Sequence, residues 1–372
     1  IAGGSASAKT GVVLLFHYLP FLVVGPFAGA LADRTDQRRL MIAADLARAA
    51  LLATLPIAFL TGHLSWPLLA VVAFLVATAS SAFAPARDAL LPRLAEGRSL
   101  VAVNASFQTS SQLAYIVGTV LSGLLLGWDR SSVRADAIVR LYWFDAASFL
   151  ASFVTLLLVA APRAERPTTR GPGALADVLE GLRHARRSRL VSGLLFLTAV
   201  DNFCIMGPAI IGATLLIKDT FGLAPAHLAL LEGALGVGWL AGSLVVLRFG
   251  TAWPKGRVLL FGILMDGLTF VPVYWIRSYP LLLAAMAFHG LWIPFIQVAR
   301  TTLVQENVPP ALLGRAFSLI NLTFVGFTGL SLLATGWLGE SLAPPAIFLV
   351  AGAGGAVAGL AGLAFRDLRR AR

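Results

Sequence analysis

The chain has 372 residues, of which 58% are hydrophobic and only 13% charged, and its mean hydropathy is +0.83. A soluble protein of this length does not bury so much apolar surface, so the composition excludes a soluble globular class and indicates a polytopic membrane protein. The net charge of +11 would also fit a nucleic-acid-binding protein, so the placement of the basic residues has to be examined.

Apolar runs of about 20 residues, the length a helix needs to cross a hydrocarbon core of about 30 Å, recur along the chain. They predict an all-α membrane protein with eleven membrane-spanning helices. The expected spans lie near residues 11–31, 40–60, 67–86, 100–127, 141–161, 191–217, 228–247, 258–276, 281–300, 316–338 and 344–365. Gly and Pro within these runs favour helices over the alternating strands of a membrane barrel.

The first two spans are separated by a short loop with five charged residues between positions 33 and 39. Such a loop lies in water, so both spans must reach it from the same side of the membrane. Loops on that side hold 21 of the 29 Lys and Arg residues, the opposite loops hold six, and Arg48 and Arg300 lie within spans. The positive-inside rule therefore places this loop and the C-terminus in the cytoplasm. This asymmetry explains the basic charge without nucleic acid.

The same loop resembles the signature loop between the second and third helices of major facilitator superfamily transporters. The resemblance rests on Gly29, Asp33, Arg34, Arg38 and Arg39. It implies that the glycine lets two helices touch, that the aspartate caps a neighbouring helix end, and that the basic pair anchors a cytoplasmic gate. Asp36 stands where the family usually has glycine, as it often does in the exporter branch related to macrolide and siderophore efflux.

An internal repeat indicates two related halves. Residues 91–104 align with residues 308–321 at an offset of 217, with Pro, Gly, Arg and Asn matching. Parallel halves of this kind are typical of the superfamily. We expect an N-terminal half at 1–161, a cytoplasmic linker at 162–190 and a C-terminal half at 191–372.

The offset also predicts which helix has no counterpart. The partner of the span at 191–217 would precede Ile1, so we expect 11 of 12 helices, with the first absent from this sequence. The alternative is a natural eleven-helix protein. In the second half, Pro309 to Arg315 resembles the Val-Pro-Pro-x-x-x-Gly-Arg stretch of the same exporter group.

The linker contains apolar residues at helical spacing, followed by a basic run. The apolar residues are Leu175, Val178, Leu179 and Leu182, and the basic ones are Arg183, Arg186, Arg187 and Arg189. This pattern predicts an amphipathic helix on the inner leaflet, where basic side chains meet anionic lipid.

Polar residues within the first-half spans are the first candidates for function. Asp45 and Arg48 are three residues apart, which predicts a structural ion pair, with a transport role as the alternative. Asn104, Gln108, Gln112 and Tyr115 form one helical stripe. We expect this stripe to face a central cavity, while hydrogen bonding between helices is the alternative.

The second half carries further intramembrane acids. Asp201 and Asn202 lie near mid-membrane, where a charged carboxylate costs roughly 2.5–3.5 kcal/mol. Burial favours the protonated acid, so Asp201 is a candidate proton-coupling group or partner of a cationic substrate; a structural hydrogen bond is the alternative. Glu232 lies near the outside and is a candidate gate acid, with a simple interfacial position as the alternative. Asp266 and His289 are expected to bond within the bundle.

The function predicted from these features is secondary active export. No Walker loop, metal-ligand cluster or nucleophile–base pair is present, which predicts a protein without enzymatic activity, cofactor or metal. We expect a monomer in the inner (plasma) membrane that exports drugs, macrolides or siderophore-like compounds by alternating access, by proton-coupled antiport. Residues 118–123 match the antiporter motif only in part, since Thr119 replaces its proline. The alternatives are a lysophospholipid or nutrient transporter, and a truncated protein that transports nothing.

Overall fold

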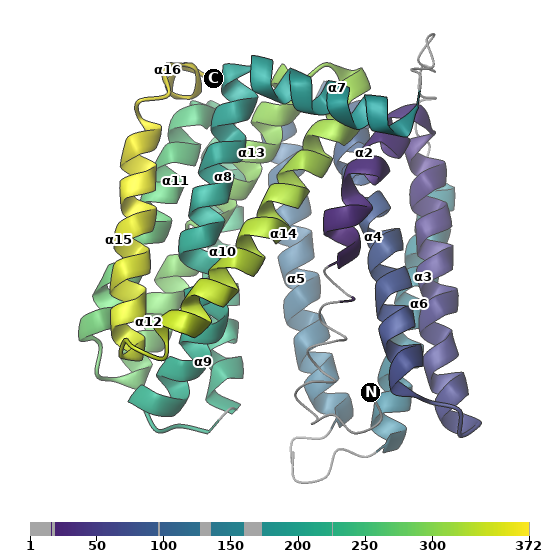
Figure 1. Cartoon of the computed structure of the whole chain (residues 1–372), viewed down its shortest axis with the longest axis horizontal. Coiled ribbons are helices and arrows are strands. Elements are labelled where there is room, and N and C mark those ends of the chain that lie inside the picture. The colour runs from purple at the N-terminus through teal and green to yellow at the C-terminus, as the bar shows by residue number, and fades with distance from the viewer. Residues whose placement is uncertain are drawn as a thin grey trace. The chain divides into compact units, whose positions relative to one another are not determined.

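The structure is a computed structural model that describes Phe16 and residues 19–95, 97–126, 135–159, 173–224 and 226–371. Over these residues every regular element is helical (Figure 1). Nine described segments are helical, long and apolar enough to cross a membrane. They are Gln37–Leu60, Trp66–Leu94, Ile138–Leu158, Arg189–Thr220, His227–Ala252, Lys255–Trp275, Tyr279–Asn307, Pro310–Leu338 and Pro344–Gly362.

Two expected spans are not among these nine. α2 (Gly25–Arg34) is the end of the span expected at 11–31, part of which lies outside the described residues. α5 (Leu100–Leu126) has 27 residues and occupies the span expected at 100–127. The all-helical membrane architecture is confirmed, and the total of eleven spans stays a prediction.

Side-chain caps mark where several helices begin. α3 (Gln37–Leu60) follows Asp36, whose carboxylate accepts a hydrogen bond from the amide of Arg39 at 3.0 Å. Ser65 caps α4 (Trp66–Leu94) and Ser188 caps α8 (Arg189–Gly207) in the same way. These side chains satisfy amides that have no partner in a first helical turn. Asp36, unusual in the signature loop, therefore has a local role as a helix cap.

The described chain forms two compact units. The first contains Ile1–Glu96, Val117–Leu182 and Val308–Leu322. In it α3 packs along both α4 and α6 (Ala135–Leu158), and α2 packs along α4 (Figure 1). Buried apolar side chains fill the contacts between these helices, among them Ala32, Met41, Ala86, Leu90 and Leu156.

The second unit contains Gly97–Ile116, Arg183–Asn307 and Thr323–Arg372. Its centre is α11 (Lys255–Phe270), which packs against α13 (Ile293–Asn307) and α15 (Pro344–Gly362), while α10 (Ala226–Phe249) packs against α12 (Tyr279–Gly290). A Cβ added at Gly267 of α11 would lie 2.7 Å from the carbonyl oxygen of Gly352 on α15. Glycine therefore allows the two backbones to approach each other, as is usual where membrane helices pack.

The compact units do not follow the sequence halves everywhere. The first part of α5, up to Ile116, belongs to the second unit, and its remainder belongs to the first. α14 (Leu313–Leu338) is divided likewise after Leu322, with its first turns in the first unit. The division at 161 and 191 stays a prediction drawn from the repeat.

Candidate functional site

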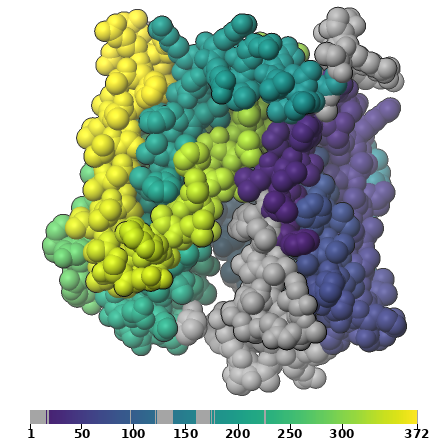
Figure 2. Space-filling view, in the orientation of Figure 1, coloured from purple at the N-terminus to yellow at the C-terminus, as the bar shows by residue number. Residues whose placement is uncertain are grey.

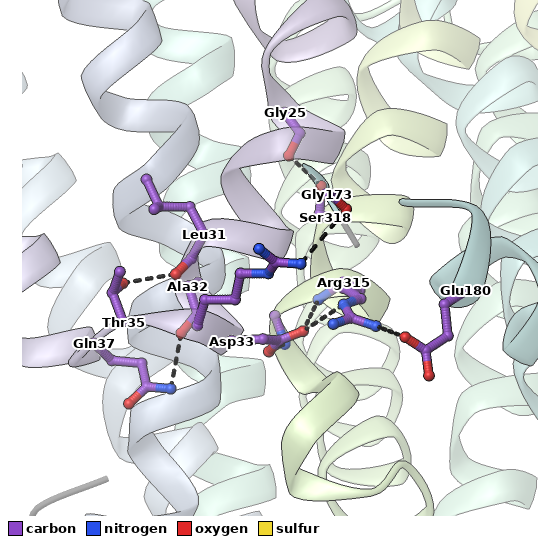
Figure 3. Close-up of polar contacts among 12 residues, drawn as sticks. Gly25, Leu31, Ala32, Asp33, Thr35, Gln37, Gly173, Glu180, Arg315 and Ser318 are labelled. Carbon is purple, nitrogen blue, oxygen red and sulfur yellow. Dashed lines mark hydrogen bonds and ion pairs between the residues drawn. The ribbon is translucent and has the colours of Figure 1, made fainter. Parts of the chain in front are cut away.

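The signature loop meets the beginning of α14 through Asp33 (Figure 3). The Asp33 side chain lies in the last turn of α2 and is only 1% exposed. Its carboxylate accepts hydrogen bonds from the amides of Gly314 at 2.6 Å and Arg315 at 3.1 Å. These amides belong to the first turn of α14, where backbone N–H groups and the helix dipole both favour an anion.

Two glycines allow this contact. A Cβ at Gly29 would lie 2.6 Å from the carbonyl oxygen of Gly314, and a Cβ at Gly314 would lie 2.6 Å from Oδ1 of Asp33. The hydroxyl of Ser318, one turn along α14, donates to the carbonyl of Gly25 (Figure 3). The expected close helix contact and aspartate cap are therefore both present in the structure.

Arg315 connects this contact to the linker helix. Its guanidinium lies 3.4 Å from the Asp33 carboxylate, and its Nη1 donates to Oε2 of Glu180 at 2.6 Å (Figure 3). Glu180 belongs to α7 (Ala174–Arg187), which occupies the segment expected to form an amphipathic helix. Leu175 and Leu179 are exposed on α7, which lies at the surface in Figure 2. We refer to Gly29, Asp33, Glu180, Gly314 and Arg315 as the Asp33 cluster.

The other basic residues of the loop bind in different ways. Arg38 donates to the carbonyl oxygens of Leu156 and Leu157 at 2.8 and 2.7 Å. These carbonyls lie at the end of α6, where a cation is favoured by the helix dipole. Arg34 donates to the carbonyl of Gly173 at 3.5 Å, and the Arg39 side chain is exposed.

The predicted ion pair between Asp45 and Arg48 is present inside the first unit. Asp45 also accepts a hydrogen bond from Ser152 of α6 at 2.6 Å. The Arg48 guanidinium lies 4.3 Å from the ring centroid of Phe83 and 4.5 Å from that of Phe149. The pair is thus enclosed by side chains of α3, α4 and α6, which is the geometry of a structural ion pair.

The four residues of the polar stripe on α5 lie in different environments. Nδ2 of Asn104 donates to Thr302 at 2.9 Å and to Gln305 at 2.7 Å, both on α13. Gln112 donates to the carbonyl of Gly236 on α10 at 3.4 Å. These two side chains are buried. They form hydrogen bonds between helices, which was the alternative to facing a central cavity. Gln108 is partly buried and Tyr115 is 54% exposed.

Asp201 and Asn202 are both buried on α8. The Asn202 amide donates to the Thr198 carbonyl at 2.7 Å, and Oδ1 of Asp201 has no hydrogen-bond partner among the described residues. Arg300 of α13 interacts electrostatically with Asp201 and donates to the Thr198 hydroxyl at 3.3 Å. After α8, the helix of Asp201, the backbone forms two π-helical turns, Pro208–Gly212 and Leu216–Thr220. Such turns are frequent at functional sites.

Arg300 was not identified from the sequence as a neighbour of Asp201. The sequence could have suggested the pair, because an arginine within a membrane span needs an anionic or polar partner. Glu232, the other predicted acid of the path, is exposed on α10 and lies outside this buried group. Among the described residues no group of three or more His, Cys, Asp or Glu side chains could hold a metal ion.

Comparison with known proteins decides the family. The family model of the Major Facilitator Superfamily matches residues 3–210 and 194–372. The chain belongs to this superfamily. Its membership confirms the resemblance of the signature loop and the all-α fold, and it makes the chain a multi-pass membrane transporter that is not an enzyme.

Relatives within the superfamily are similar over most of the chain. Macrolide efflux protein A of Enterococcus faecalis is 28% identical over 317 residues, covering 84% of this chain and 95% of that protein. Multidrug efflux pump Tap of Mycobacterium tuberculosis is 25% identical over 355 residues, covering 93% of this chain and 82% of the pump.

Solved structures share the superfamily fold. The fucose:proton symporter FucP of E. coli has a TM-score of 0.75 at 15% identity, with 96% of this chain and 90% of that chain covered. A bacterial homologue of the iron transporter ferroportin, in an outward-facing state, has a TM-score of 0.74 at 15% identity, with 98% and 91% covered. At these identities the likeness concerns the fold alone.

Proposed function

We propose that this transporter exports small amphipathic molecules by alternating access. The observation that carries the proposal is that Macrolide efflux protein A and Multidrug efflux pump Tap are similar to at least 84% of the chain. The scarcity of fixed charge within the spans is consistent with hydrophobic cargo. Macrolides and siderophore-like compounds are the proposed substrate classes.

The proposed energy source is the proton gradient, coupled through Asp201. A charged carboxylate near mid-membrane costs roughly 2.5–3.5 kcal/mol, and binding a proton removes that charge. Oδ1 of Asp201 accepts no hydrogen bond from a described residue, so it can take up a proton without breaking one. Arg300 supports the carboxylate when it is ionised. Asn202, Gln108, Tyr115 and Glu232 are the further residues proposed for the path.

The open oxygen of Asp201 also favours a second candidate, direct binding of a cationic substrate. A substrate ammonium group would satisfy Oδ1 in place of a proton. In that case transport of a cation would depend on Asp201, while transport of a neutral molecule would not.

The Asp33 cluster is proposed as a gate on the cytoplasmic side of a bacterial plasma membrane. The excess of Lys and Arg in the loops on its side supports this orientation. The cluster joins α2, α14 and α7 by charge-assisted hydrogen bonds, which can break and re-form as a unit during transport.

The proposal is tested in inverted membrane vesicles that contain the full chain, by following a cationic fluorescent dye and a radiolabelled neutral macrolide with an imposed pH gradient. Export predicts uptake of both into the vesicles and loss of uptake when a protonophore collapses the gradient. Asp201→Asn should lower the gradient-driven uptake of both compounds at least tenfold. Glu340→Gln, which alters an exposed acid, should transport like the wild type.

The outcomes separate the two candidate roles. If Asp201→Asn lowers uptake of the cationic dye but not of a neutral macrolide, Asp201 binds cations and does not couple protons. If pH-driven uptake of both persists undiminished, Asp201 has neither role. Vesicles that accumulate neither compound at any gradient contradict the export proposal itself.

A further inference from the structure

A second buried acid, Asp266, faces the imidazole of His289 in the second unit. Oδ1 of Asp266 on α11 lies 3.6 Å from Nε2 of His289 on α12. The two residues are 4% and 2% exposed. Oδ1 accepts no hydrogen bond from any described residue. An ionised carboxylate in an apolar interior is costly unless a proton or a donor compensates it, and the nearest titratable group is this imidazole.

Thr269 restricts where the protons of this pair can lie. Its hydroxyl is 2.8 Å from Nδ1 of His289, 2.8 Å from the carbonyl of Met265 and 3.1 Å from the carbonyl of Asp266, so its one hydrogen goes either to a backbone carbonyl or to the imidazole. If the hydroxyl donates to Met265, Nδ1 carries the imidazole hydrogen and Nε2 is free to accept one from Asp266. If the hydroxyl donates to Nδ1, Nε2 carries the hydrogen and directs it at the Asp266 carboxylate.

The two arrangements of Thr269 therefore correspond to two protonation states of Asp266. In one the carboxyl group is protonated and can donate; in the other it is a carboxylate that accepts. Passing from the first state to the second releases one proton from the Asp266–His289 pair and places the remaining imidazole hydrogen on Nε2, while the Thr269 hydroxyl turns toward Nδ1.

The surroundings exclude water from this group. The ring of Phe270 stacks on the imidazole with 4.2 Å between centroids, and Phe348 of α15 meets Phe270 edge-on at 5.1 Å. Both phenylalanines are 1% exposed. The Asp266–His289 pair is therefore shielded from direct contact with water.

Among the described residues, further ionisable side chains around Asp266 come from α8 and α13. From α8 come Asp201, which interacts electrostatically with Asp266, and Cys204, which interacts with Asp201. Arg300 of α13 acts on Asp201. α15 has no ionisable side chain.

The basic helix α16 (Arg366–Arg370) meets α11 at its first turn, where the Gly256 amide bonds to the Ala371 carbonyl. That turn is about 15 Å from Asp266 along the helix axis.

We propose that Asp266, His289 and Thr269 form a proton-binding site of their own, separate from Asp201, which holds one proton shared between carboxyl and imidazole. The inference goes beyond the proposed export, because the site binds its proton whether or not cargo is moved. Asp201 and Asp266 interact electrostatically, so the charge on one affects proton binding by the other.

Infrared difference spectroscopy of the purified full chain, titrated with acid, tests the proposal. The carbonyl stretch of protonated carboxylic acids reports buried Asp residues directly. Asp266→Asn should remove one titrating band, and Asp201→Asn should leave that band in place. In His289→Gln the midpoint of the band should move by about one pH unit or more, because strongly interacting groups titrate as a pair. Glu340→Gln, which removes an exposed acid, is the control and should leave the Asp266 band and its midpoint unchanged.

A matched pair at Thr269 completes the test. Thr269→Val keeps the shape without the hydroxyl and should move the midpoint, whereas Thr269→Ser keeps the hydroxyl and should titrate like the wild type. If Asp266→Asn does not fold, these variants and His289→Gln still decide. The proposal is overturned if the midpoint is the same in wild type, His289→Gln and Thr269→Val, or if Asp201→Asn alone abolishes the band assigned to Asp266.

Discussion

The carboxylate of Asp33 accepts a hydrogen bond of 2.6 Å from the backbone amide of Gly314, across 281 positions of sequence. One side chain from the end of α2 thereby completes the first turn of α14. Because the partner is a backbone amide, the bond depends on the charge and reach of Asp33 and on the absence of side chains at the two facing glycines.

Replacing the charge at position 33 should weaken this contact. Asp33→Asn keeps the size of the side chain but loses the anion that faces two amides and a guanidinium. We expect a loss of about 0.3–2 kcal/mol in the free energy of unfolding, the range for an anion at a helix N-terminus, together with slower transport. Thermal unfolding of the purified protein and dye efflux measure the two effects. Asp36→Asn is the matched control, since asparagine caps helices as well as aspartate does; equal losses in both variants would argue against a special role for Asp33.

A methyl group at the helix contact should be disruptive only where the backbones touch. In Gly29→Ala the new Cβ would lie 2.6 Å from the Gly314 carbonyl oxygen, so α2 and α14 must separate. The expected cost is about 1–3 kcal/mol, as for other overpacked sites. Gly25→Ala, one turn earlier on α2, meets nothing within 4 Å and should be neutral or slightly stabilising. The melting temperatures of the two variants should therefore differ, and indistinguishable values would contradict the contact.

Glu180 should contribute far less to the stability of the protein than Arg315, its ion-pair partner. Its side chain is 59% exposed, and exposed ion pairs are worth about 0–1 kcal/mol and weaken with salt. Glu180→Gln should thus change the melting temperature little, and the change should shrink in high salt. Arg315→Gln should cost more, because the Arg315 side chain is only 10% exposed and lies against Asp33. A larger effect from Glu180 than from Arg315 would show that α7, rather than the Asp33 contact, holds the cluster together.

Breaking the buried pair of the first unit should be the most severe change. In Asp45→Asn the Arg48 guanidinium would stay between two phenylalanine rings without its carboxylate, which typically costs about 3–5 kcal/mol. We expect poor yields of folded protein in membranes, measured by fluorescence-detected size exclusion. The double variant Asp45→Asn with Arg48→Met removes both charges and should recover part of the yield. No recovery in that double-mutant comparison would indicate that the two side chains act separately.

Local physical chemistry made much of this protein predictable from its sequence. Runs of about 20 apolar residues cannot be placed in water, so the membrane class followed directly from hydropathy. The resemblance carried by Gly29, Asp33 and Arg38 implied the helix contact and the cap, and the structure contains both. The pairing of Asp45 with Arg48 followed from helical geometry, since residues three apart share a face.

Contacts between distant segments needed the tertiary structure. Nothing in the sequence around Arg300 indicates that it lies near Asp201, or that His289 faces Asp266 across two helices. Likewise, helical spacing placed Asn104 on a polar stripe, but only the packing of the helices shows that its side chain bonds to α13. Helical periodicity determines which side chains share a face, whereas the rotation and neighbours of each helix come from how all the helices pack together.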